Sequence, residues 1–132
     1  MPGDVRLYAQ EPAFTSLDVQ FLEHLNIIVR DTGIENQIFD STFVFAPFVD
    51  WFILLPVFLK GKDPDLYLGN EILQDYAQYA TSTEKENVLS VCHEVGKQFA
   101  QGRDRVWLHS FEFHANALNG IMAYWKQDDE DD

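Results

Sequence analysis

The amino-acid sequence predicts an α/β fold, with a mostly parallel sheet, helices on its faces and a C-terminal pair of antiparallel strands at one edge. The chain has 132 residues, the usual size of one domain, and its 46% hydrophobic and 14% aromatic residues suffice for a packed core. Runs typical of strands alternate with runs typical of helices, which indicates parallel strands. We therefore expect one domain over residues 1–127 and an acidic disordered tail over 128–132.

Four short apolar runs predict the parallel strands. They are rich in β-branched and aromatic residues, which pack well on a pleated surface. The run "TFVFA" is apolar on both faces, as expected for a central strand of a parallel sheet. The four predicted strands are residues 4–9, 26–31, 42–46 and 65–69.

Helices are predicted between these strands. Thr15 and Asp18 form a near capping box before a run whose apolar residues recur at helical spacing. Thr83 and Glu86 open the longest predicted helix in the same way, and Gly102 ends it. The predicted helices are residues 15–25, 51–60 and 81–102, and a shorter one begins within 70–80.

The nearly continuous apolar stretch 42–61 raises the question of a membrane-spanning helix. Such a helix needs about 20 apolar residues without helix breakers. Pro47 disfavours helical backbone at the residue before it, and Asp50 suits a helix N-cap, so the stretch divides into a strand and a helix. Pro56 is expected to kink that helix. We expect this stretch in the protein core and not in a membrane.

The last segment follows a different pattern. Residues 105–125 carry two apolar runs with no helical run between them. This pattern favours an antiparallel pair of strands at the edge of the sheet, and one strand followed by a short helix is the alternative.

Charge and cysteine content limit the classes of function. The formal net charge of −13 argues against nucleic-acid and anionic membrane surfaces as partners, because phosphate binding needs clustered Lys and Arg. The single cysteine, Cys92, cannot form an internal disulfide, so we expect a reducing compartment and a buried structural thiol. Residues 1–10 lack the basic-then-apolar pattern of a signal peptide. The expected location is cytoplasmic, nuclear or both.

No catalytic set is apparent in the sequence. It contains neither of the glycine-rich phosphate motifs G-x-G-x-x-G and G-x-x-x-x-G-K-[ST], nor the G-x-S-x-G elbow of Ser/His/Asp hydrolases. The four histidines have no metal-binding spacing, and the odd separation of His109 and His114 points them to opposite faces of a strand. The four are His24, His93, His109 and His114. We expect no metal, no cofactor and no catalytic residues.

Four polar residues are the candidates for a ligand site. In open α/β sheets ligands bind beyond the carboxyl ends of the strands. Glu11, Asp50, Asn70 and Glu71 each follow a predicted strand at that end. Ordinary structural roles compete with binding: Asp50 and Asn70 suit helix N-caps, and Glu11 suits a solvated or turn-capping position.

Three phrases of the sequence resemble the sensitivity-to-red-light-reduced (SRR-like) domain family. They are "LYAQEPAFTSLDVQFLEHLNIIV", "STFVFAPFVDWFILLPVFLKGKDPDLYLGN" and, more loosely, "FEFHANALNG". The family pattern has a strand running into an acidic-Pro-x-Phe-Thr turn, a helix ending in Leu-Gly-Ile, a "TFLFAPH"-like strand and a Gly-Asn after the next strand. Residues 11–15, 25–27, 42–47 and 69–70 occupy those places.

This chain departs from the SRR-like pattern in two ways. Phe48 stands where many relatives carry His after "FAP". Many relatives also carry a "GLGS"-like segment upstream, which this chain is expected to lack. The resemblance implies a Rossmann-like three-layer sandwich and a regulatory role, linked in plants to light signalling and the circadian clock.

The expected function is that of a non-catalytic regulatory or interaction protein of the SRR-like family, linked to clock, stress or transcriptional regulation. The alternative is a small-molecule or nucleotide-binding enzyme, such as a methyltransferase-like protein, that uses the carboxyl edge of the sheet. We expect a protein partner, no direct nucleic-acid binding and no membrane binding. We also expect a homodimer, with residues 7–10 or the 105–125 edge at its interface, because exposed strand edges invite pairing.

Overall fold

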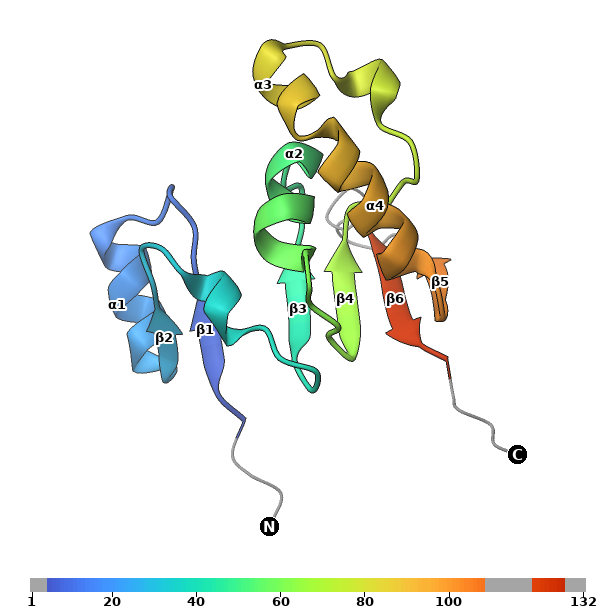
Figure 1. Ribbon diagram of the computed structural model, residues 1–132. Helices are drawn as coiled ribbons and strands as arrows, with labels where there is room; N and C mark the ends of the chain where they lie inside the picture. Colours follow the sequence, from blue (N-terminus) through green and yellow to red (C-terminus); the bar gives the residue numbers. More distant parts are fainter. Residues whose placement is uncertain (1–4, 109–119, 128–132) are drawn as a thin grey trace. The chain divides into compact units, whose positions relative to one another are not determined.

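The computed structural model of the chain describes residues 5–108 and 120–127. The chain divides into two compact units, residues 1–37 and residues 38–132. Figure 1 shows the elements of both units. The expectation of a single domain over 1–127 stays a prediction.

The first unit is a small βαβ arrangement. Its elements are β1 (Leu7–Ala9), α1 (Ser16–His24), β2 (Ile27–Val29) and the 3-10 turn η1 (Ile34–Gln37). The two strands are parallel, as predicted, with Leu7 paired to Ile27. The predicted capping box is confirmed: the Thr15 hydroxyl accepts a hydrogen bond from the Asp18 N–H (3.1 Å), and the Asp18 carboxylate accepts one from the Thr15 N–H (2.9 Å). No residue among the described positions 5–37 is buried.

The second unit contains a four-stranded sheet. Its strands are β3 (Phe43–Ala46), β4 (Leu66–Gly69), β5 (Arg103–Trp107) and β6 (Met122–Lys126), in the order β3-β4-β6-β5. Only β3 and β4 are parallel neighbours, because β6 lies between β4 and β5 and runs antiparallel to both. The antiparallel pairing of the last two strands matches the preferred prediction for that segment.

The predicted Rossmann-like three-layer sandwich with a mostly parallel sheet is wrong. The structure has a two-stranded parallel sheet in one unit and a four-stranded mixed sheet in the other. In the mixed sheet, the last strand inserts at an internal position, where it makes two antiparallel pairings instead of extending an edge. The local alternation of strands and helices does not encode that insertion.

The helices of the second unit follow the sequence only in part. They are α2 (Trp51–Ile53), the π-helical η2 (Leu54–Leu59), the 3-10 turn η3 (Ala77–Tyr79), α3 (Thr83–Asn87) and α4 (Leu89–Ala100). The helix predicted within 70–80 is wrong apart from η3, and the helix predicted over 81–102 is interrupted at Val88. In the described part of the chain, no helix combines the length and apolar character that crossing a membrane requires.

The π-helical turn η2 contains Pro56. Proline has no backbone N–H, so it cannot join the regular ladder of an α-helix, and a wider turn absorbs the missing bond. The structure thus has a change of helix type around Pro56, where the sequence predicted a kink.

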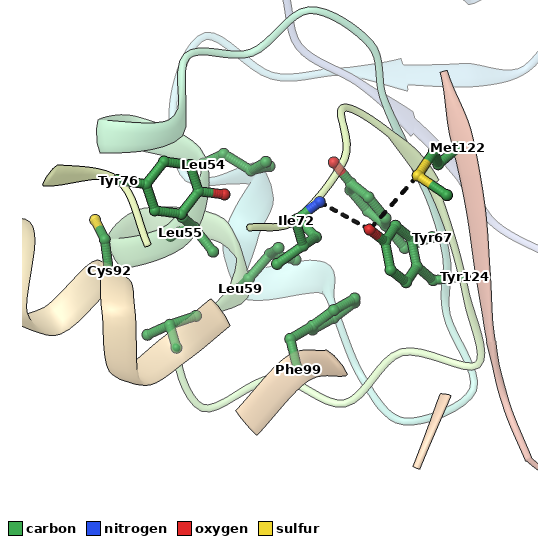
Figure 2. Packing of buried hydrophobic residues seen from close by; sticks show 11 residues of the cluster. Leu54, Leu55, Leu59, Tyr67, Ile72, Tyr76, Cys92, Phe99, Met122 and Tyr124 are labelled. Carbon is green, nitrogen blue, oxygen red and sulfur yellow. Dashed lines mark hydrogen bonds between the residues drawn. The ribbon is translucent and has the colours of Figure 1, made fainter. Parts of the chain in front are cut away.

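The core of the second unit lies between one face of the sheet and two helical segments. Figure 1 shows α2 and α4 on the same face of the four-stranded sheet. Figure 2 shows the side chains of η2, β4, α4 and β6 that meet there. The buried cluster consists of Leu54, Leu55, Leu59, Tyr67, Ile72, Tyr76, Cys92, Val95, Phe99, Met122 and Tyr124. Cys92 is a free, fully buried thiol, as predicted.

Candidate functional site at the carboxyl edge of β3 and β4

The candidate edge is formed where the parallel strands β3 and β4 end. Because the strands are parallel and paired from Phe43↔Leu66 to Ala46↔Gly69, the residues that follow them leave the sheet at the same edge. Residues 47–50 follow β3, and residues 70–76 follow β4. Asp50, Asn70 and Glu71 therefore lie at one edge of one sheet, as predicted.

Asn70 joins these two segments. Its side-chain oxygen accepts a hydrogen bond from the backbone N–H of Phe48 (3.0 Å), and its side-chain nitrogen donates one to the carbonyl of Val49 (2.8 Å). Phe48 has a φ of 59°, a left-handed conformation that is unfavourable for a bulky side chain. Asn70 thus supports a strained turn, whereas the sequence suggested a ligand contact or a helix cap.

Three buried tyrosines hold the backbone of the segment after β4. The Tyr67 hydroxyl donates to the carbonyl of Asn70 (3.0 Å). The Tyr124 hydroxyl accepts from the Ile72 N–H and the Tyr76 hydroxyl from the Leu73 N–H, both at 2.8 Å. Figure 2 shows the bond between Ile72 and Tyr124. Residues 70–76 thus form no helical hydrogen bonds, but tyrosine hydroxyls bind backbone groups of Asn70, Ile72 and Leu73.

Burial sets the protonation of these tyrosines. Desolvation raises the pKa of Tyr76 to about 12 and raises those of Tyr67 and Tyr124 as well. At neutral pH each of the three hydroxyls therefore keeps its proton and is uncharged in the core. The Tyr67 hydroxyl can thus donate its hydrogen bond to the carbonyl of Asn70.

The two acidic candidates at this edge differ in their contacts. The carbonyl of Asp50 accepts hydrogen bonds from Ile53 (3.0 Å) and Leu54 (2.8 Å), but its carboxylate makes no capping bond. Asp50 therefore occupies the N-cap position without the side-chain cap that the sequence suggested. Glu71 lies 3.8 Å from the guanidinium of Arg105 on β5, a partly exposed ion pair.

Glu11 belongs to the first unit and has a local role there. Its exposed carboxylate accepts a hydrogen bond from the Ala13 N–H at 3.2 Å. This contact matches the turn-capping alternative. The function of Glu11 as a ligand contact remains a prediction.

The histidines do not form a metal centre in the described part of the chain. His93 Nε2 accepts a hydrogen bond from the Tyr76 N–H (2.9 Å) and lies 3.3 Å from the Asp75 carboxylate. Among the residues that the structure describes, no three His, Cys, Asp or Glu side chains gather as metal ligands would. His109 and His114 lie outside the described residues.

The opposite end of the strands carries an ion-pair network. Arg103 is buried, stacks over the ring of Phe99 (4.1 Å to its centroid) and donates to the carbonyl of Pro64 (2.9 Å) and to Asp63. Lys126 lies 3.4 Å from the Asp63 carboxylate. A depression of about 520 Å³ adjoins this network, lined by segments that precede β3 and β4. These contacts neutralise the buried guanidinium, so we interpret the network as structural.

The sequence interpretation missed an apolar surface, which we call the open sheet face. The strand register places its side chains in two rows across all four strands. One row is Phe43, Leu66, Trp125 and Asp104, and the other is Phe45, Leu68, Ala123 and Val106. The helical residues of the core contact the other face, which carries Tyr67 and Tyr124. Period-two alternation in "TFVFAP" could not reveal this face, because both sets of alternating residues are apolar.

The open sheet face is exposed at its outer positions. Phe43 and Phe45 on β3 are 59% and 56% exposed, and Val106 on β5 is 46% exposed. Trp125 on β6 is also exposed, while Leu66 and Leu68 are half-buried. Only Asp104 adds a charge to the two rows.

The fold and the edge define a mixed α/β protein in which Asn70 and three buried tyrosines bind the backbone of the carboxyl edge. The model of the SRR1 domain family matches residues 2–125, so the chain belongs to the SRR1 domain family. The sequence resemblance is thereby confirmed. The chain matches no curated protein and no solved structure.

Proposed function

We propose that this SRR1-family chain is a non-catalytic interaction protein that binds a protein partner through the open sheet face. The observation that carries the proposal is the exposure of large apolar side chains along two registered rows of one sheet. Contiguous apolar surface of this kind marks interaction sites in natural proteins. Aromatic residues such as Phe43, Phe45 and Trp125 are the side chains that interfaces favour.

The carboxyl edge supports the same proposal. Both polar atoms of the Asn70 side chain bind the 48–49 backbone, and Glu71 lies beside Arg105. The tyrosine hydroxyls around them bind backbone groups of residues 70–73. The Asn70 amide and these hydroxyls therefore serve the fold of the edge itself, which favours a structural role for them over the orientation of a substrate.

The finer features of the proposal rest on composition and family resemblance. The net charge of −13 supports a protein partner over direct contact with nucleic acid or anionic membranes. The resemblance to SRR-like proteins supports a regulatory role in clock, stress or transcriptional control. We place the protein in the cytoplasm, the nucleus or both.

A second candidate is a small-molecule or nucleotide-binding enzyme that uses the carboxyl edge. It is favoured by the Asp50 carboxylate, which makes no capping bond although it stands at a helix N-terminus. The strained Phe48 beside it is of the kind found at ligand sites. A thermal-shift screen with nucleotides and S-adenosylmethionine tests this candidate. A bound ligand at 100-fold excess over its dissociation constant adds about 2.7 kcal/mol of stability.

The first candidate is tested by quantitative co-purification from the native source. Wild type is compared with Val106→Lys, which places a charge on the open sheet face, and with Ser90→Ala on the exposed side of α4 as control. We expect a protein that is enriched with wild type and Ser90→Ala, is lost with Val106→Lys, and binds the purified chain directly. Identical sets of co-purifying proteins for all three chains, or multiple turnover of a defined substrate, would contradict the proposal.

A further inference from the structure

His93 on α4 holds the backbone of the segment that follows β4. Its Nε2 atom accepts a hydrogen bond from the Tyr76 N–H at 2.9 Å. An imidazole nitrogen accepts a hydrogen bond only when it carries no proton, so this contact needs a neutral His93 with its proton on Nδ1. Histidine is the side chain that ordinarily changes charge between about pH 5 and 8, so the acceptor in this bond is open to titration.

The carboxylate of Asp75 lies next to the same nitrogen, 3.3 Å from Nε2. Neutral Nε2 has no hydrogen to donate, and Asp75 Oδ1 accepts a hydrogen bond from the Ala77 N–H at 2.9 Å. A proton on Nε2 reverses the preference, because it would meet the hydrogen of the Tyr76 N–H, whereas the carboxylate accepts it in a charge-assisted hydrogen bond. His93 therefore has one partner for each of its protonation states.

We propose that His93 is a pH switch at the carboxyl edge: proton binding to Nε2 breaks its hydrogen bond with the Tyr76 N–H, pairs His93 with Asp75 and opens the backbone of residues 74–79. The 3-10 turn η3 depends on this bond, since the Tyr79 N–H bonds the carbonyl of Tyr76 at 2.9 Å. The turn thus begins at the residue that His93 holds. This inference is independent of the proposed partner-binding face.

The Tyr76 side chain has contacts of its own, which limit the change to the backbone. Its hydroxyl accepts a hydrogen bond from the Leu73 N–H at 2.8 Å. Its ring stacks on Trp51, with the ring centroids 4.8 Å apart, and the residue is buried in the core. Neither contact uses the imidazole of His93. The sheet and its core should therefore stay folded while residues 74–79 open.

The titratable groups around α4 leave Asp75 as the determining one. Burial raises the pKa of Tyr76 to about 12 and raises the pKa of the Cys92 thiol, so both groups stay uncharged where histidine titrates. Among the described residues, Asp75 is the only carboxylate at ion-pair distance from His93. Of the elements packed against α4, α2 and η2 have no titratable side chain, and β5 places Arg103 over Phe99 near the C-terminal end of the helix. The remaining charged residues, on α3 and on α4 itself, are Glu84, Lys85, Glu86, Glu94 and Lys97.

The switch is tested by nuclear magnetic resonance of the full chain between about pH 5 and 8. The ring nitrogens of His93 report its tautomer, and the shift and hydrogen exchange of the Tyr76 amide report the bond. His93→Gln supplies a side-chain oxygen that accepts the bond without titrating. Asp75→Asn removes the charge and keeps an oxygen for the Ala77 N–H. His24→Gln is the matched control, because His24 is exposed at the end of α1.

In wild type we expect the Nδ1–H tautomer at the alkaline end of the range and a Tyr76 amide shift that follows the protonation of His93. The protection of this amide should fall about two- to tenfold on acidification, while the β4 amides keep theirs. Asp75→Asn should lower the pH midpoint, because the charged imidazole loses its partner, and His24→Gln should leave the transition unchanged.

His93→Gln should abolish the pH dependence of the Tyr76 amide. A wild-type Tyr76 amide that does not follow the titration of His93, an Nε2–H tautomer at the alkaline end, or a transition that persists in His93→Gln would each overturn the inference. An unchanged midpoint in Asp75→Asn would contradict the exchange of partners and overturn it as well.

Discussion

Both polar atoms of the Asn70 side chain form hydrogen bonds with the turn that follows β3. Asn70 bonds the N–H of Phe48 and the carbonyl of Val49, and so holds Phe48 at a φ of 59°. The sequence located Asn70 at the carboxyl edge because Gly-Asn follows a predicted strand. Its partners lie 21 and 22 residues earlier in the chain, and no local pattern encodes a contact at that separation.

Replacing this residue tests its structural role. We expect Asn70→Ala to lower the free energy of unfolding by about 1–3 kcal/mol, because both backbone groups lose their partner. Asn87→Ala is the matched control, since Asn87 is exposed on α3, and it should stay within about 0.5 kcal/mol of wild type. Urea denaturation measures both. If Asn70→Ala left the free energy of unfolding unchanged, the structural role would be contradicted and the interpretation of Asn70 as a ligand contact would be favoured.

The buried tyrosines predict an alkaline limit to stability. Burial raises the pKa of Tyr76 from 10.0 to about 12 and also raises those of Tyr67 and Tyr124, so the unfolded chain releases these protons first. The stabilising contribution of Tyr76 is thus complete below about pH 10 and is lost as the pH rises through about 12, and the raised pKa values of Tyr67 and Tyr124 act in the same direction. We expect the urea midpoint to fall over this range together with a rise in tyrosinate absorbance. The fall should be shallower in Tyr76→Phe, and a midpoint constant up to pH 12 would contradict this account of the core.

At the scale of elements, α4 and the segment after β4 approach closely at Gly96. A Cβ at this position would collide with the backbone carbonyl of Leu73, which Tyr76 holds in place through the Leu73 N–H. Gly→Ala within a helix normally adds up to about 1 kcal/mol of stability. We expect Gly96→Ala to lower the melting temperature instead, while Ser90→Ala on the exposed side of α4 leaves it unchanged or slightly raised. A stabilising Gly96→Ala would show that residues 70–76 do not pack as described.

The sequence predicted the positions of most elements because their local signals are strong. Capping residues located α1, and the apolar runs located β3 and β4. The helix predicted to begin within residues 70–76 does not form there. Tyrosine side chains supply hydrogen-bond partners to the backbone of this segment, so an irregular backbone leaves its polar groups as well paired as a helix would. The predicted long helix 81–102 failed at Val88, where the φ of −106° breaks the helical run between α3 and α4.

At the scale of the whole molecule, strand order was not predictable. Two apolar runs near the C-terminus predicted an antiparallel edge pair, which β5 and β6 form, but the sequence did not show that β6 lies beside β4 and β5 at the edge. Pairing a late strand internally depends on contacts such as that of Tyr124 with Tyr67 and Phe99 in the core. Local periodicity carries no information on such contacts, so the Rossmann-like expectation failed while the mixture of helices and strands held.

We expect the two units to behave differently when each is produced as a separate fragment. The buried cluster belongs entirely to residues 38–132, whereas the described residues of the first unit include none that is buried. A two-stranded sheet without a core is not stable on its own. We expect fragment 38–132 to unfold cooperatively and peptide 1–37 to give a random-coil circular dichroism spectrum. A folded peptide 1–37 would contradict the assignment of the core.

The claim that the open sheet face, and not the carboxyl edge, carries the function is tested most directly by one affinity comparison. The partner obtained by co-purification is titrated calorimetrically into wild type, Val106→Lys and Glu71→Gln. We expect Val106→Lys to weaken binding at least about tenfold, because a desolvated apolar contact is replaced by a charge. Glu71→Gln should bind as wild type does, because it alters the ion pair with Arg105 at the carboxyl edge and leaves the open sheet face unchanged. Full affinity in Val106→Lys combined with loss in Glu71→Gln would contradict the claim.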